Sequence, residues 1–225
     1  GFHLRPLEEC PMGKAVPAMY YSASATVMVD FHGKAAHAAR PHLGINALDA
    51  ASHAVQAVNG IHLAPSLTWS AKATRFLCDA GVTNSVPENA HVCWDLRCEE
   101  NDGMATLKER VVRAIESSAA AYGASADIRI VKEMPAAIID EDATAIVSQA
   151  IRETFGEAGL TAAKSTPGSE DFFHYLRLRP AVKGGFWGLG CNLQPGLHHP
   201  EMHFDRAALA DGVRVFKSCV RQLLG

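Results

Sequence analysis

The chain has 225 residues, with 21 basic and 24 acidic side chains and a formal net charge of −3. This balance gives no electrostatic reason to expect nucleic acid or an anionic membrane as a partner, and no apolar run reaches the roughly 18 residues of a membrane span. A hydrophobic content of 48% suits one large domain or two small ones. The six cysteines form no C-x-x-C pair, which favours a reducing, cytoplasmic location over a disulfide framework.

The middle of the chain predicts a domain built from four strands and two helices. Residues 26–32 alternate between apolar and polar side chains, as a half-buried strand does. In residues 89–98, Val92, Trp94 and Leu96 face one way, and His91 and Arg97 face the other. This order is the ferredoxin-like β-α-β-β-α-β arrangement, which leaves one face and an edge of the sheet uncovered, so we expect a homodimer. The predicted elements are strand 26–32, helix 46–60, strands 68–78 and 89–98, helix 101–122 and strand 126–133.

The last third of the chain predicts more helix. Apolar spacing indicates a helix over 142–155, and a short apolar strand is expected around 185–189. Glu170 and Asp171 are the only paired carboxylates in a glycine-rich loop, and we expect them to cap the next helix rather than to bind metal. A terminal helix capped by Asp205 is predicted to bury one apolar stripe: Leu209, Val213, Phe216, Val220 and Leu223.

Two of the eleven histidines are candidate metal ligands. His3 precedes a turn-rich segment, and a neutral imidazole there can bind zinc or a similar ion. His198 is followed by His199, and adjacent side chains in extended backbone point in opposite directions, so only one would reach a given metal. On the residues alone, a solvated His3 and an ordinary loop histidine at 198 remain the alternatives.

Three other residues are candidates for contacts with a substrate. His37 lies in a small-residue loop after a strand, where it can donate to developing negative charge. Asn84 precedes a Ser-Val-Pro turn that would pin its amide. Arg97 can clamp a carboxylate with two hydrogen bonds. The alternatives are a surface histidine, a turn asparagine and a structural ion pair of Arg97 with a neighbouring carboxylate.

Taken in order, several segments resemble the M20 family of metal-dependent peptidases and amidohydrolases. The subgroup most similar to them is the aminoacylase, aminobenzoyl-glutamate or dipeptide hydrolase branch. Three segments resemble the catalytic domain of that family: GFHLRP (1–6), GSEDF (168–172) and LHHP (197–200). Four segments resemble its lid, or dimerisation, domain: GKAAHAA (33–39), GINALDA (44–50), TNSVP (83–87) and DLR (95–97).

The resemblance implies a fold and an activity. The fold would be α/β, with a ferredoxin-like lid at 25–134 inserted into a zinc-peptidase-like catalytic domain formed by 1–24 and 135–225. The activity would be metal-dependent hydrolysis of an amide bond in N-acyl amino acids or dipeptide-like substrates. The cofactor would be two divalent metal ions, with zinc favoured by histidine ligands and manganese, cobalt and nickel as alternatives.

The resemblance also assigns roles to the candidate residues. His3 and His198 look like metal ligands, and His37 looks like the donor that stabilises the oxyanion in the site of a partner subunit. Asn84 and Arg97 would hold the substrate.

The other metal ligands of the family and its general base lie upstream of the segment that begins at Gly1. We therefore expect this chain to be the C-terminal portion of such an enzyme. The alternative is a non-catalytic dimerisation or binding module. A single metal ion bound by His3, His198 and a carboxylate such as Glu170 is a third interpretation, with no pattern behind it.

Overall fold

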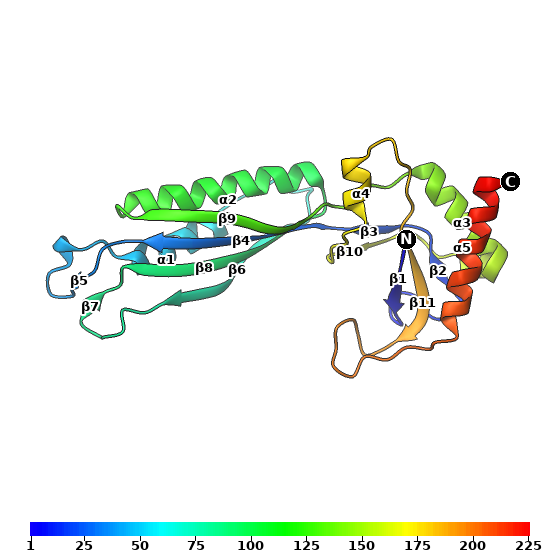
Figure 1. The fold of residues 1–225 in the computed structure, drawn as a ribbon, viewed down its shortest axis with the longest axis horizontal. Helices are drawn as coiled ribbons and strands as arrows, with labels where there is room; N and C mark the ends of the chain where they lie inside the picture. Colours follow the sequence, from blue (N-terminus) through cyan, green and yellow to red (C-terminus); the bar gives the residue numbers. More distant parts are fainter. The chain divides into compact units, whose positions relative to one another are not determined.

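The computed structural model describes all 225 residues, which divide into two compact units. Unit 1 comprises Gly1–Tyr21 and Ala137–Gly225, and unit 2 comprises Ser22–Ala136. Both chain termini therefore belong to unit 1, and unit 2 is an insertion in its sequence (Figure 1). No helix of either unit combines the length and the apolar character needed to cross a membrane.

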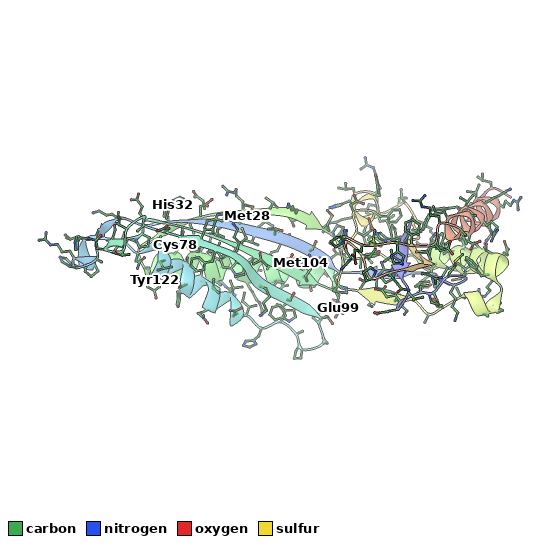
Figure 2. All side chains as sticks on the ribbon, turned by 90° about the horizontal axis from the view of Figure 1, so that it is seen from below. Met28, His32, Cys78, Glu99, Met104 and Tyr122 are labelled. Carbon is green, nitrogen blue, oxygen red and sulfur yellow. The ribbon has the colours of Figure 1, made fainter.

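Unit 2 is built on a four-stranded antiparallel sheet with the strand order β6-β8-β4-β9. Two helices lie along one face, and Figure 2 shows Met28 and His32 on the other side of the sheet, away from these helices. The observed order of elements is β-α-β-β-α-β, as the periodicity predicted. The elements are β4 (Ala23–His32), α1 (Ala47–Asn59), β6 (Trp69–Cys78), β8 (Asn89–Cys98), α2 (Asn101–Ala121) and β9 (Ser125–Met134), with the short β5 (Ala36–His37), η1 (Pro41–Leu43) and β7 (Ser85–Val86).

The apolar residues predicted to face the core of unit 2 are buried. Val27, Val29 and Phe31 of β4 expose no surface, and Trp94 of β8 exposes 1%. The helix α2 also buries a stripe of side chains at helical spacing, whereas Tyr122 lies just beyond the helix and is 43% exposed. The buried members of this stripe are Met104, Leu107, Val111, Ile115 and Ser118.

Unit 1 has two small sheets and three α-helices. In the larger sheet, with strand order β1-β11-β2, the first and last strands in sequence, β1 and β11, pair in parallel. In the smaller sheet, β10 pairs in parallel with β3. The elements are β1 (Phe2–Pro6), β2 (Ala15–Val16), β3 (Met19–Tyr21), α3 (Glu141–Phe155), η2 (Glu157–Gly159), β10 (Lys164–Thr166), α4 (Phe173–Leu178), β11 (Trp187–Leu193) and α5 (Ala208–Leu224).

The prediction for the terminal helix α5 was wrong about which face is buried. The residues of the predicted stripe are exposed, from 39% at Phe216 to 66% at Val213 and Leu223. The face that packs into unit 1 carries Val215 and otherwise small side chains, among them Ala208, Gly212 and Cys219. Small residues let the helix backbone approach β11 and α3 closely, and Gly212 lies against Leu189 of β11. Asp205 accepts a hydrogen bond from the Ala207 amide just ahead of the helix (2.9 Å).

Candidate functional site

His3 is the second residue of β1 and is paired with Gly188 of β11. Its Nδ1 is 2.8 Å from the carbonyl oxygen of Leu4. A carbonyl oxygen only accepts hydrogen bonds, so Nδ1 carries the proton and the lone pair of the neutral ring is on Nε2. This is the tautomer in which Nε2 can bind a metal ion.

The Glu170 carboxylate lies within electrostatic reach of His3. Burial raises the pKa of the Glu170 carboxyl and a side-chain hydrogen bond with Asp171 acts in the same direction, whereas the backbone amide of Asp171 and the nearby imidazole of His3 oppose both. The expected helix cap is absent, because α4 begins at Phe173 and no side chain caps it. Glu170 instead accepts a hydrogen bond from the backbone amide of Asp171 (3.0 Å). Glu170 thus lies in the loop just before α4 and close to His3, without capping the helix.

His198 lies in the loop that follows β11. Leu197 packs against the core of unit 1, and backbone hydrogen bonds between Gln194 and His203 close the loop. His198 has a φ of 64°, in the left-handed region that non-glycine residues adopt at a cost. The next side chain, His199, is held locally, because its Nδ1 accepts a hydrogen bond from the Glu201 amide (3.1 Å).

These residues do not make up a complete metal site by themselves. His3 and His198 have the donor chemistry of metal ligands. However, nowhere in the 225 residues do three or more His, Cys, Asp or Glu side chains come together as a metal site. The interpretation of a single metal ion bound by His3, His198 and Glu170 was therefore wrong, since these three residues form no such group.

A buried polar group that the sequence pattern missed lies close to His3 in the same strand. Arg5 is only 2% exposed; its Nε donates to Glu9 Oε2 (2.9 Å) and its Nη1 donates to the Tyr21 hydroxyl (3.1 Å). Burial raises the pKa of Tyr21 to about 12, so its hydroxyl stays neutral. The only signal in the sequence for this ion pair was the spacing of four residues between Arg5 and Glu9. This group holds the end of β1, and through it the strand that carries His3.

His37 and Asn84 meet at one end of unit 2. In the pairing of β5 with β7, His37 lies opposite Ser85, and the amide of Ala38 donates to the Asn84 carbonyl (2.8 Å). The Nδ1 of His37 accepts a hydrogen bond from the Ala39 amide (3.1 Å). In the neutral ring the proton is therefore on Nε2, and the exposed side chain presents an N–H donor to the outside.

Arg97 lies in β8 of the four-stranded sheet, near the end remote from β5 and β7 (Figure 1). It faces Ser24 in the register of β4 with β8, whereas Asn89 faces His32 near the other end. The strand rise puts about 26 Å between Asn89 and Arg97. The guanidinium binds Asp95 through two hydrogen bonds, of 2.8 Å from Nε and 3.0 Å from Nη2, and the pKa of Arg97 is raised chiefly by this contact. The structure therefore brings His37 and Asn84 together but does not bring Arg97 to them.

Comparisons with known proteins identify the family. The sequence profile of peptidase family M20/M25/M40 matches residues 6–222. N-acetyldiaminopimelate deacetylase of Streptococcus thermophilus is 29% identical over 217 residues, which cover 95% of this chain and 56% of that protein. A Rhodococcus jostii protein that bears the name glutamate–cysteine ligase 2-3 is 29% identical over 209 residues, covering 89% of this chain but only 26% of that protein.

Solved structures have the same fold. The aminobenzoyl-glutamate utilization protein of Klebsiella pneumoniae superposes with a TM-score of 0.81 at 20% identity, over 97% of this chain and 52% of that one. The YXEP protein of Bacillus subtilis, described as a dinuclear metal binding peptidase from the M20 family, has a TM-score of 0.72 at 22% identity, over 100% of this chain and 56% of that one. The chain spans little more than half of these proteins and of the deacetylase. Because the family profile covers nearly all of its residues, the chain belongs to peptidase family M20/M25/M40.

Proposed function

We propose that the chain is the C-terminal part of a metal-dependent amidohydrolase that cleaves the amide bond of N-acyl amino acids or dipeptide-like substrates. Membership of the M20/M25/M40 family supports this, as does the likeness to an N-acetyldiaminopimelate deacetylase. The observation that carries the proposal is the hydrogen bonding of two histidines. It leaves a lone pair on Nε2 of His3, which can bind a metal ion, and a proton on Nε2 of His37, which can be donated in a hydrogen bond.

His3 and His198 are proposed to bind two divalent metal ions together with ligands from outside these residues. Metal-bound histidines commonly donate their other ring N–H to a carbonyl oxygen, as His3 does to Leu4. The strained backbone of His198 is of the kind that concentrates at functional sites. The further ligands and the general base would come from a region of the protein outside these 225 residues, corresponding to the part of the relatives that this chain does not match. The metal ions, with zinc favoured, would activate the attacking water.

His37 is proposed to stabilise the oxyanion that forms when water attacks the amide. A donor fixed in advance and aimed at developing charge is worth more than one that must reorganise. The backbone hydrogen bond to Nδ1 fixes the ring, and Asn84 immediately precedes Ser85, the residue paired with His37. Arg97 is proposed to bind the carboxylate of the substrate in exchange for that of Asp95.

Unit 2 is proposed to be a ferredoxin-like lid through which two chains form a homodimer. His37 and Asn84 lie beyond the Asn89 end of the ten-residue strand β8, whereas Arg97 lies near its other end, about 26 Å from Asn89. An N-acyl amino acid is too short to touch both ends at once. If both ends bind substrate, His37 must therefore act in the site of a second chain.

A non-catalytic dimerisation or binding module is the second candidate. The observation that favours it is the absence of any complete group of metal-binding side chains in the 225 residues. For either function, we propose a reducing cytoplasmic location, supported by six cysteines that are all free.

The role of His37 is tested in a longer protein that includes the upstream region. We expect His37→Ala to lower kcat for an N-acetyl amino acid by about 10²–10³-fold, the usual effect of losing one oxyanion donor. His42→Ala is the matched control, because His42 is exposed in the same loop, within η1. Equal kcat values for the two variants would refute the role of His37.

Metal content separates the two candidate functions. Elemental analysis should find about two metal ions per chain in the longer protein and almost none in residues 1–225 alone. The longer protein should also lose amide hydrolysis in the presence of a chelator. A longer protein that binds no metal and hydrolyses no N-acyl amino acid would instead identify a non-catalytic module.

A further inference from the structure

Three side chains on the face of the sheet that no helix covers form a chain of hydrogen bonds. His91 Nδ1 lies 2.7 Å from Asp30 Oδ1, and His91 Nε2 lies 3.2 Å from the sulfur of Cys93. The sheet creates this group: Asp30 is the cross-strand partner of His91, and Cys93 is two residues further along β8, on the same face. Met28, the cross-strand partner of Cys93, marks this face in Figure 2.

The hydrogen bonds give each member of the group a defined role. The hydrogen bond from His91 is the main cause that lowers the pKa of Asp30, so Asp30 is a carboxylate that accepts the Nδ1 proton. The lone pair of His91 is then on Nε2, where it faces the thiol of Cys93. Arg129 holds the other oxygen of Asp30 at 2.7 Å and so fixes the carboxylate. This is the order of groups that activates a cysteine nucleophile: an orienting carboxylate, an imidazole base and a thiol.

The other five cysteines lack such a base. Cys10, Cys98 and Cys191 expose no surface, and burial raises the pKa of each thiol. Burial also raises the pKa of Cys219. Cys78 is the most exposed of the six, yet its thiol donates to the carbonyl oxygen of Asn89 and its pKa is also raised by burial.

Small reagents have a route to the group. A surface hollow is lined by Asp30, His32, Cys78 and His91, among others, and so it reaches the imidazole of His91, although Cys93 itself is not part of its lining. Cys93 itself is 8% exposed, which leaves part of the residue accessible.

We propose that Cys93 is a modification site for small disulfides, with His91 as its base and Asp30 as the residue that orients His91. The proton of the thiol passes to His91 Nε2, and the sulfur of Cys93 forms a bond with one sulfur of the disulfide. The S–S bond of the reagent breaks, and the released thiolate takes the proton from His91. Cys93 is oxidised to a mixed disulfide, and the other half of the reagent is reduced to a thiol. This inference does not rest on the proposed hydrolase function.

The test is site-resolved mass spectrometry of the folded 225-residue chain during exposure to glutathione disulfide at pH 7. We expect Cys93 to be modified before Cys78, although Cys78 is the more exposed thiol. Modification of Cys78 first would mean that exposure alone decides reactivity, and it would overturn the proposal. This comparison needs no variant and so does not depend on any substitution being tolerated.

A pair of variants tests the role of His91. His91→Gln keeps a polar side chain but removes the base, so the rate at Cys93 should fall about tenfold, since an ordinary thiol is only about 3% thiolate at pH 7. The rate at Cys78 should stay the same. His32→Gln is the matched control, because His32 lies on the same face and binds Asn89 and Asp127 rather than Cys93. An unchanged rate at Cys93 in His91→Gln, or equal losses in both variants, would overturn the proposal.

Discussion

The two units of the chain differ in how they bury their helices. In unit 2, α1 and α2 place their apolar faces on a four-stranded sheet, and the core residues of β4 and β8 expose almost no surface. In unit 1, α5 packs through small residues, while Val213, Val220 and Leu223 remain more than half exposed. The indole N–H of Trp187, buried beside α5, has no hydrogen-bond partner. Unit 2 is a complete packing unit, whereas unit 1 has an apolar face that nothing within these residues covers.

The difference between the two units should be largest when unit 2 is separated from unit 1, because we expect unit 2 to fold by itself. The two ends of its chain lie next to each other, because Ser24 and Met134 pair across β4 and β9, so residues 22–136 can be excised without cutting the sheet. We expect this fragment to unfold cooperatively on heating and to bind little of an apolar dye. The whole chain should bind the dye strongly through the exposed residues of α5. A fragment without a cooperative transition in circular dichroism would contradict this view of unit 2.

The next effect compares one leucine from each unit. Leu107 of α2 is fully buried, and Leu107→Ala should lower the free energy of unfolding of unit 2 by about 2–5 kcal/mol. Leu223 of α5 is 66% exposed, and Leu223→Ala should change stability by no more than about 0.5 kcal/mol. Denaturant unfolding of both variants measures this. A cost at Leu223 as large as that at Leu107 would show that the exposed face of α5 is covered in solution, for example by self-association.

The smallest effect concerns the polar face of unit 2. The pKa of Asp30 is lowered by the hydrogen bond from His91 and by Arg129, so the folded state favours the carboxylate. The Asp30 carboxylate therefore contributes to the free energy of unfolding above its unfolded pKa of about 3.9. This contribution is lost as the pH falls through the lower pKa of the folded state. Asp30→Asn should therefore cost less than about 1 kcal/mol at pH 7, because the pair is partly exposed. The free energies of unfolding of the variant and of the unsubstituted chain, measured by denaturant unfolding, should become more similar below about pH 4. A difference between them that grows in acid would refute this account.

Periodicity was sufficient for unit 2 but only partly sufficient for unit 1, where it predicted α3 and the start of β11. The alternation in β4 and β8 and the stripe of α2 each have one apolar face, so the pattern states which side is buried. The strands β1, β2 and β3 have five residues or fewer, and such short segments carry no usable period. The helix α5 has apolar character on two faces, one of small and one of large residues, and the pattern pointed to the large one. Only the packing shows that the small face was used.

The candidate site also has features that the sequence indicated and features that only the structure shows. The motifs around His3, His37, Asn84, Arg97 and His198 were visible in order along the chain, and they indicated the family that the profile confirms. Their roles remain predictions. The proton positions on His3 and His37 depend on hydrogen bonds with backbone groups, which no pattern of side chains encodes.

The sequence by itself determined the family, the β-α-β-β-α-β order of unit 2 and the residues that fill its core, because local periodicity and ordered motifs are properties of neighbouring residues. Tertiary structure alone decided which residues from distant segments meet. The register of β4 with β8 places Asp30 beside His91, and the pairing of β5 with β7 places His37 opposite Ser85, next to Asn84 in the chain. These contacts join residues 47 or more positions apart, and they depend on hydrogen bonds between strands whose register a single sequence does not specify.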